Sequence, residues 1–285
     1  KYYKNNKYYT LTFAIPNDLT VSGIKLILDN NGAVRFEGVK STDRRQDQLP
    51  PTLETTPPPI ITNIYKTQKA FAALDVTGKV HVWGGGYEGS YGGSLPDTLD
   101  PANNPPIITN TNIYSGLNAF AALDVTGKVH VWGHGGYGGS LPATLDVTNP
   151  PKITNIYRTA YAFAALDVNR KLHVWGRDGY GGSLPDTLDP ATDPPKITNI
   201  YSTLSAFTAL DVTGKVHVWG HGSYGGSLPD ILNTTPPPII TNIYSAHSYG
   251  FAALTSDGMV VMWGKADYDK IGKNSSGEKV NVIYN

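Results

Sequence analysis

The chain has no cysteine among its 285 residues. It therefore contains no disulfide, no thiol nucleophile and no thiolate metal ligand, and its fold needs no oxidising compartment. Charged residues make up only 16% of the chain, with 23 basic and 23 acidic side chains. A nucleic-acid partner is not expected, because such proteins concentrate basic residues on one face or segment. Membrane insertion is not expected either, because no apolar run approaches the roughly 18 residues of a spanning helix.

Glycine and proline, by contrast, are abundant, with 31 and 21 residues. Together with the low charge, this composition favours many short strands and turns over long helices. It is also typical of surface-exposed or secreted modules, which favours an extracellular or cell-surface location. The expected fold class is therefore all-β.

One eleven-residue sequence, LDVTGKVHVWG, occurs three times without change, and related versions occur three more times. Five of the six copies contain a tryptophan, and the tryptophans are separated by 49, 43, 44 and 44 residues. In the copy nearest the N-terminus, LDNNGAVRFEG, a glutamate takes the place of the tryptophan. The six copies are Leu28–Gly38, Leu74–Gly84, Leu123–Gly133, Leu166–Gly176, Leu210–Gly220 and Leu254–Gly264.

Each repeat of about 44 residues has the pattern of a small antiparallel sheet. KITNIY, AFTAL and KVHVW are β-rich runs, and the last of them alternates at period two. Asp-Val-Thr-Gly between the second and third runs predicts a hairpin loop in which glycine supplies a positive φ. A fourth strand is expected near GGSLP, and the proline-rich stretch after it predicts an outer connection.

Such sheets have two apolar faces and must pack on one another, which predicts a β-propeller. We expect six blades in a single domain spanning residues 1–285. The alternative is seven blades, with residues 1–22 forming strands of their own. Lys279–Tyr284, KVNVIY, aligns with the first strand of a repeat, so we expect it to complete the N-terminal blade and close the ring.

The pattern AALDVTGKVHVWG followed by YGGSL resembles the repeats of the regulator of chromosome condensation family. The last copy, Ala252–Gly272, is the most similar to that pattern. The resemblance implies a propeller, usually with seven blades. The family's protruding hairpin for nucleotide exchange on a small GTPase has no counterpart in this chain, which weakens a GTPase-regulator function.

Four histidines occupy one equivalent strand position, which raises the question of a metal site. Equivalent positions on neighbouring blades lie about 10 Å apart, whereas zinc needs nitrogens at about 2.0–2.1 Å. We therefore interpret them as histidines on the polar face of a strand and expect no metal and no cofactor. They are His81, His130, His173 and His217.

Asp124, His130 and Ser140 recur in equivalent form in several repeats, which raises the possibility of a catalytic triad. A catalytic site is normally one asymmetric arrangement, and repeated copies favour a structural role. The aspartate of LDVTG is expected to bond its own turn backbone. HGGYGGS lacks the lysine and the following helix of a phosphate loop. We therefore expect that the chain is not an enzyme.

The loops after Trp-Gly carry a second set of equivalent residues, which we expect to share one rim of the propeller. Exposed aromatic side chains give large contact area, so this rim is the predicted binding site. The alternative is that each tyrosine packs beneath its own loop, and a different site at Asp43–Asp47 also stays open. The five tryptophans, Trp83, Trp132, Trp175, Trp219 and Trp263, are expected to be structural. The predicted rim residues are Tyr91, Tyr137, Tyr180, Tyr224, Tyr268, His134, Arg177 and His221.

These observations favour a non-enzymatic scaffold that binds a partner macromolecule, most simply a protein, through its loops. A lectin with one glycan site per blade is the first alternative. A structural subunit of a surface or virion assembly and a regulator of a small GTPase are the others.

Overall fold

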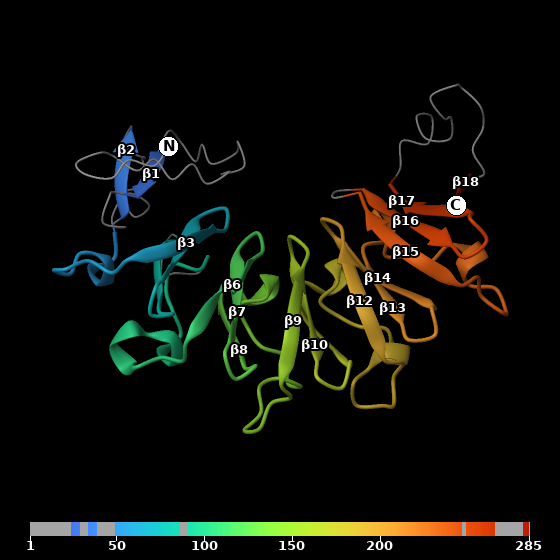
Figure 1. Cartoon of the computed structure of the whole chain (residues 1–285), viewed down its shortest axis with the longest axis horizontal. Helices are drawn as coiled ribbons and strands as arrows, with labels where there is room; N and C mark the ends of the chain where they lie inside the picture. The colour runs from blue at the N-terminus through green and yellow to red at the C-terminus, as the bar shows by residue number, and fades with distance from the viewer. Residues whose placement is uncertain are drawn as a thin grey trace. The chain divides into compact units, whose positions relative to one another are not determined.

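A computed structural model of the chain describes residues 24–28, 34–38, 49–85, 91–246, 249–265 and 282–284. It consists of short strands joined by turns and single-turn 3-10 helices (Figure 1). Its contacts divide the chain into two compact units, Lys1–His134 and Gly135–Asn285. The prediction of a single domain stays a prediction. Residues 1–22 of the seven-blade alternative and the Asp43–Asp47 loop lie outside the described residues.

In the residues that the structure describes, the first unit contains three sheets and the second unit contains three more. The strands of the first unit are β1 (Ile24–Leu28), β2 (Val34–Gly38), β3 (Ile61–Lys66), β4 (Ala70–Asp75), β5 (Val80–Gly84), β6 (Ile108–Ser115), β7 (Ala119–Asp124) and β8 (Val129–Gly133). Those of the second are β9 (Ile153–Arg158), β10 (Ala162–Asp167), β11 (Leu172–Gly176), β12 (Ile197–Ser202), β13 (Ala206–Asp211), β14 (Val216–Gly220), β15 (Ile240–Ser245), β16 (Gly250–Thr255), β17 (Val260–Gly264) and β18 (Val282–Tyr284). The 3-10 helices are η1 (Pro51–Leu53), η3 (Asp97–Leu99), η4 (Pro101–Asn103), η5 (Gly135–Tyr137), η6 (Asp178–Tyr180), η7 (Asp186–Leu188), η8 (Gly222–Tyr224) and η9 (Asp230–Leu232).

Each tryptophan-containing repeat forms three consecutive antiparallel strands, with the alanine-rich strand in the middle. Small antiparallel sheets of this kind are consistent with the blades of a β-propeller. The expected fourth strand at GGSLP is wrong, because this stretch forms a turn after η5, η6 and η8. Proline has no N–H to donate, and the paired glycines favour turns, so the sequence cannot extend the ladder. The number of blades stays a prediction.

The hairpin between the second and third strands is built as the sequence predicts. Gly78 has a φ of 84° and Gly214 has the same value, which is the left-handed conformation that glycine adopts most easily. Asp75 accepts hydrogen bonds from the backbone N–H groups of Thr77 and Lys79 at 2.8 and 3.0 Å. The predicted role of this aspartate in its own turn is therefore confirmed.

Within each unit, a sheet offers an alanine-rich face to the aromatic face of the sheet that follows. In the first unit, Ala70 and Ala72 of β4 pack in one cluster with Phe120 and Trp132 of the next sheet. In the second unit, Ala162 and Ala164 are covered in the same way by Phe207 and Trp219. The small side chains let the sheets approach closely, and all five tryptophans are buried, with only 3–4% of their surface exposed.

The prediction that the C-terminal strand completes the N-terminal blade is wrong. Val282–Tyr284 forms β18, which pairs in parallel with β17 of its own repeat (Figure 1). The free edge of β17 offers unpaired N–H and C=O groups to an extended segment. A segment that returns from nearby in the sequence also closes a much shorter loop than one that must reach β1 and β2.

The two-stranded sheet of the first copy has the same hairpin register as the other repeats. Its Lys25 lies opposite Glu37, at the positions where the next sheet has Phe71 opposite Trp83. The first copy therefore has charged residues at the positions that elsewhere supply the aromatic pair.

Candidate functional site

A buried Asp–His pair lies at the hairpin end of four sheets. One oxygen of the aspartate holds the turn, and the other accepts a hydrogen bond from Nε2 of the histidine two positions into the next strand. The sequence analysis expected these histidines on the polar face of a strand, and this expectation is wrong. Because each histidine is paired with an aspartate, it can lie buried or nearly so. The oxygen–nitrogen distances are 3.1 Å for Asp75–His81, 2.9 Å for Asp124–His130, 3.4 Å for Asp167–His173 and 2.8 Å for Asp211–His217.

The environment of the Asp124–His130 pair favours a carboxylate beside a neutral imidazole. Burial alone would raise the pKa of Asp124, but hydrogen bonds from His130, Thr126 and Lys128 outweigh it and the pKa is lowered. Burial lowers the pKa of His130, and the neighbouring carboxylate only partly offsets this. The same balance lowers the pKa of His173. The Asp124–His130 pair thus joins two strands by a hydrogen bond without burying two opposite charges.

The last repeat loses both members of the pair at once. Thr255 stands where the other repeats have aspartate, and Val261 stands where they have histidine. The threonine still accepts from the backbone N–H of Met259 at 2.9 Å, so the turn keeps its anchor. The joint replacement is what a structural pair predicts, since either residue alone would leave a buried polar group without its partner.

His130 makes no hydrogen bond with Ser140, the third residue of the possible triad. Its Nδ1 lies 3.5 Å from the hydroxyl of Thr98, on the preceding outer loop, rather than beside Ser140. This distance is at the limit of a hydrogen bond. In the described residues, the corresponding Nδ1 atoms of His81 and His173 have no hydrogen-bond partner. The repeats thus share the Asp–His pair but not a nucleophile.

The opposite end of each sheet is held by a backbone contact that places the residue after Trp-Gly. The N–H of Arg177 donates to the carbonyl of Tyr161 at 3.0 Å, so the two side chains leave the sheet side by side. His221 is fixed in the same way on Ser205 at 3.0 Å, and Lys265 is fixed on Tyr249. Residues before the middle strand and residues after the third strand therefore meet at this rim.

The rim tyrosines are positioned by the short helices that follow. The N–H of Tyr180 donates to the carbonyl of Arg177 at 2.9 Å, and the Tyr180 carbonyl accepts from Thr159 Oγ1 at 3.2 Å. Gly181, next in sequence, has a φ of 106°, and a Cβ there would meet the ring of Phe207. The Gly181 carbonyl accepts from Trp219 Nε1 at 3.2 Å. The loop is thus held against the aromatic pair of the following sheet.

In the second unit, these side chains form a continuous tyrosine–cation row across three sheets. Tyr161 lies between Tyr137 and Tyr180, with ring centroids at 5.8 and 4.5 Å. Tyr180 contacts His221 at 5.3 Å, and His221 meets Tyr224 edge-on at 5.1 Å. We define the row as Tyr137, Tyr161, Arg177, Tyr180, His221, Tyr224 and Lys265.

Two fully charged side chains lie over tyrosine rings of the row. The Arg177 guanidinium carbon is 4.6 Å from the Tyr180 centroid and 6.0 Å from that of Tyr161. The Lys265 ammonium is 5.9 Å from the Tyr224 centroid. Cations are attracted to the negative face of an aromatic ring at such distances.

The first unit carries a shorter version of the same arrangement. The Lys69 ammonium lies 4.1 Å from the Tyr91 centroid, and the His134 ring lies 6.0 Å from it. In both units, therefore, a loop tyrosine reaches the residue that follows Trp-Gly in the next sheet.

Of the eight rim residues predicted from the sequence, Tyr268 lies outside the described residues. His134 and Arg177 are exposed, whereas the four described tyrosines and His221 are half-buried. Sequence analysis missed Lys69, Tyr161 and Lys265. Lys69 and Tyr161 directly precede the middle strand of their sheets, at a position where the residue differs among the repeats. A comparison of shared positions therefore does not find them, although the hairpin register places this position beside the residue after Trp-Gly.

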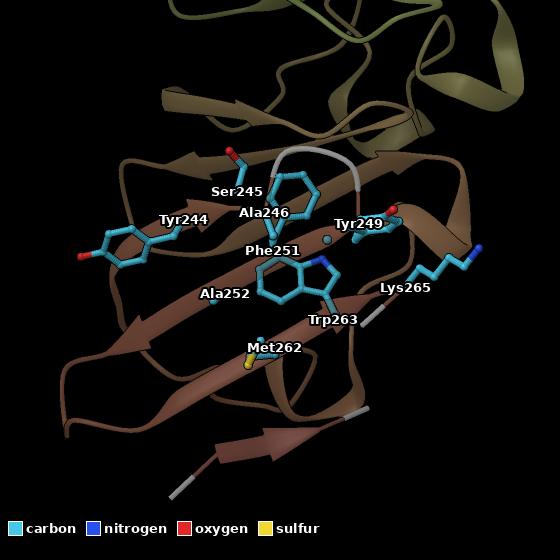
Figure 2. Close-up of a pocket in the computed structure, with 10 residues that line it drawn as sticks. Tyr244, Ser245, Ala246, Tyr249, Phe251, Ala252, Met262, Trp263 and Lys265 are labelled. Atoms are coloured by element: carbon cyan, nitrogen blue, oxygen red, sulfur yellow. The ribbon is translucent and has the colours of Figure 1, made fainter. Parts of the chain in front are cut away.

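An open cavity of about 660 Å³ adjoins the row on the last sheet (Figure 2). Its walls include Ala252 and Met262, which belong to the face that packs on a following sheet in the other repeats of this unit. Figure 2 shows Tyr249 and Lys265 together at one edge of the cavity and Tyr244 at the other. Tyr244 and Tyr249 are 59% and 56% exposed. Lys265 therefore belongs to both the row and the cavity.

The described residues contain neither a metal-binding cluster nor a membrane-spanning helix. No cluster of three or more histidine or acidic side chains is arranged there for a metal ion. The described part of the chain also has no helix with the length and apolar character to cross a bilayer.

No protein-family model matches the chain, and a search of curated protein sequences returned no significant match. Several solved structures are similar to it. Human WBSCR16 is 16% identical, with a TM-score of 0.47 over 85% of this chain and 74% of that chain. Prp20p from Saccharomyces cerevisiae is 16% identical, with a TM-score of 0.45 over 91% and 74%. The ectodomain of the Physcomitrella patens receptor kinase CR4 is 14% identical, with a TM-score of 0.45 over 92% and 65%. At these identities and TM-scores, the likeness identifies no family and carries no argument about function.

Proposed function

We propose that the chain is a non-enzymatic scaffold that binds a partner protein through the rim of its sheets. The observation that carries this proposal is the tyrosine–cation row, in which side chains from three sheets meet at one end of the strands. Tyrosine and arginine are enriched among the residues that dominate protein interfaces. Half-buried tyrosines anchored by their neighbours also lose little conformational freedom on binding.

The Asp–His pairs support a structural rather than a catalytic role. They lie at the hairpin end, buried, with one carboxylate oxygen fixed by the turn. Their histidines join two strands, and four sheets have the same pair. A nucleophile aligned with a base, which an acyl-transfer site requires, is not repeated with them.

A lectin function is less well supported by the row. Sugars stack on an open aromatic face, whereas the rings of Tyr91 and Tyr180 already have a cation over a face at 4.1 and 4.6 Å. A partner would therefore contact the cations Lys69 and Arg177 rather than the covered ring faces of Tyr91 and Tyr180.

For the architecture, we propose a single β-propeller domain of six repeats whose pattern is of the regulator of chromosome condensation type. The five tryptophans would then be structural throughout. Their support is burial together with stacking on the phenylalanine of the middle strand, as for Phe163 and Trp175 at 5.4 Å. A location outside the cell belongs to this proposal as well.

A steric block of the rim tests the binding function without touching the packing. A Cβ added at Gly179 meets no atom within 4 Å, so Gly179→Trp should fold normally and obstruct the row. Asn169→Trp, in the exposed hairpin turn of the same sheet, is the matched control. Immobilised wild type and Asn169→Trp should retain the same proteins from a cell extract, and Gly179→Trp should lose them. Equal retention by all three forms would place the binding site elsewhere.

A further inference from the structure

We propose that the row and the adjoining cavity together bind an acidic polypeptide segment that carries a large aromatic side chain. This inference rests on the proposed function and specifies the chemistry of the partner.

The charge of the row points to an anionic partner. Arg177 and Lys265 are exposed, and in the described residues neither pairs with a carboxylate. The acidic residue next to the row in sequence is Asp178, itself exposed. The tyrosine faces hold the cations by their flat sides, which leaves the N–H groups at the edge of the guanidinium available. Such N–H groups match the two oxygens of a carboxylate.

The same contacts favour a polypeptide over a sulfated or acidic glycan. Stacking of a sugar on Tyr180 would have to compete with Arg177, which already covers one of its faces at 4.6 Å, while His221 contacts the ring at 5.3 Å. Carboxylates on flexible side chains can reach the cations without displacing either contact. Aspartate and glutamate side chains in an extended segment meet this requirement.

The cavity specifies the second element of the partner. In the preceding sheets of this unit, the equivalent alanine-rich face receives a phenylalanine and a tryptophan from the next sheet, as Phe207 and Trp219 cover Ala162. On the last sheet, in the described residues of this unit, the face around Ala252 receives no such pair and leaves a cavity of about 660 Å³. An aromatic side chain from a partner therefore matches the face that the described residues of this unit leave open.

Lys265 connects the two elements, because it lies over Tyr224 and also lines the cavity (Figure 2). A segment whose carboxylates contact Arg177 and Lys265 would thus bring its next residues to the cavity edge at Tyr249. One continuous ligand can use both features.

Fluorescence anisotropy with defined peptides tests this inference. The probes are a labelled glutamate-rich peptide with one tryptophan, the same peptide with alanine in its place, and a lysine-rich version with the tryptophan. Wild type should bind the first most tightly, the second more weakly, and the third not at all. Arg177→Gln and Lys265→Gln should each weaken the first by about threefold to fivefold, as expected for losing one exposed ion pair.

Matched variants separate the two elements. Lys215→Gln removes the same charge at the hairpin end and should leave binding unchanged. Ala252→Trp fills the cavity and should abolish the advantage of the tryptophan peptide over the alanine peptide. Tyr249→Ser removes an exposed wall and should reduce that advantage even if Ala252→Trp fails to fold.

Several results would overturn the inference. Equal affinity for acidic and basic peptides would remove the charge argument, and equal effects of Lys215→Gln and Arg177→Gln would make the binding nonspecific. Tighter binding of a sulfated glycan, with the same dependence on Arg177, would replace the polypeptide by a glycan. If the peptides fail but Gly179→Trp still loses the captured proteins, the partner chemistry is wrong and the binding rim stands.

Discussion

The two ends of each sheet differ in how strongly they vary from repeat to repeat. The hairpin end is almost constant: the aspartate, the turn glycine and the histidine recur, and the pair is buried or nearly so. At the rim, the loop tyrosine recurs, but the residue after Trp-Gly is Gly85, His134, Arg177, His221 or Lys265 in turn. Positions that make the same packing contacts in every repeat keep the same residues, whereas positions that contact one particular partner can differ between repeats. The comparison fits the proposed function, in which the hairpin end supports stability and the rim binds a partner.

The interior between the ends should give the largest effect on stability. Trp175 stacks on Phe163 and donates from Nε1 to the Gly138 carbonyl at 3.0 Å. Trp175→Ala should therefore lower the free energy of unfolding by about 3–5 kcal/mol, as for other buried aromatic residues. Urea unfolding followed by circular dichroism measures this. Val168→Ala, in the exposed turn of the same sheet, should change it little, and equal effects of the two would contradict a structural role for the tryptophan.

The hairpin end should show an intermediate effect. Asp124→Ala removes the anchor of the turn and the partner of buried His130, so we expect a loss of about 1–3 kcal/mol in unfolding free energy. The double variant Asp124→Thr/His130→Val copies the residues of the last repeat and should recover part of that loss. A double variant that is less stable than Asp124→Ala would mean that the two residues do not act as a pair.

Acid should weaken the hairpin end in two stages. The pKa values of His130 and His173 are lowered from 6.5, so the unfolded chain takes up protons first, and stability falls as the pH drops below about 6.5. The pKa values of Asp75, Asp124 and Asp211 are lowered from 3.8, so a second loss follows as the pH falls below 3.8. Urea midpoints between pH 7.5 and 3 would show both stages. The first stage should shrink in the double variant, and a midpoint that rises on acidification would contradict the neutral, buried histidines.

The rim should show the smallest effect on stability. Arg177 is exposed, so Arg177→Gln should change the unfolding free energy by less than about 0.5 kcal/mol. Thermal unfolding of the variant beside wild type tests this. A large loss of stability would mean that the cation–tyrosine contacts hold the sheets together and are not primarily a binding surface.

Much of the hairpin end could be predicted from the sequence, because its rules are local. The alternation of KVHVW, the turn glycine and the capping aspartate are set within about ten residues, and all three are found in the structure. The Asp–His pair was missed, although Thr255 and Val261 change together in the last repeat. That joint change was the available signal.

The rim and the C-terminus could not be predicted as well, because they depend on which segments meet in space. The backbone contact with Arg177 and the ring contacts with Tyr137 and Tyr180 place Tyr161 in the row, and no shared position among the repeats reveals them. Lys279–Tyr284 resembles a first strand, but the pairing of β18 follows from the free edge of β17 rather than from sequence similarity. The prediction of a fourth strand at GGSLP was wrong for a related reason. The strand pattern there is weak, and the strand was expected mainly because propeller blades have four strands.

Hydrogen–deuterium exchange with and without the acidic tryptophan peptide tests the division of roles most directly. The account predicts that the peptide slows exchange in the rim loops, at residues 177–182 and 221–226 and at Lys265 beside the cavity, and leaves the hairpin turns at residues 167–171 and 211–215 unchanged. Protection at the hairpin turns, or no protection at the rim under conditions where the peptide is bound, would contradict it.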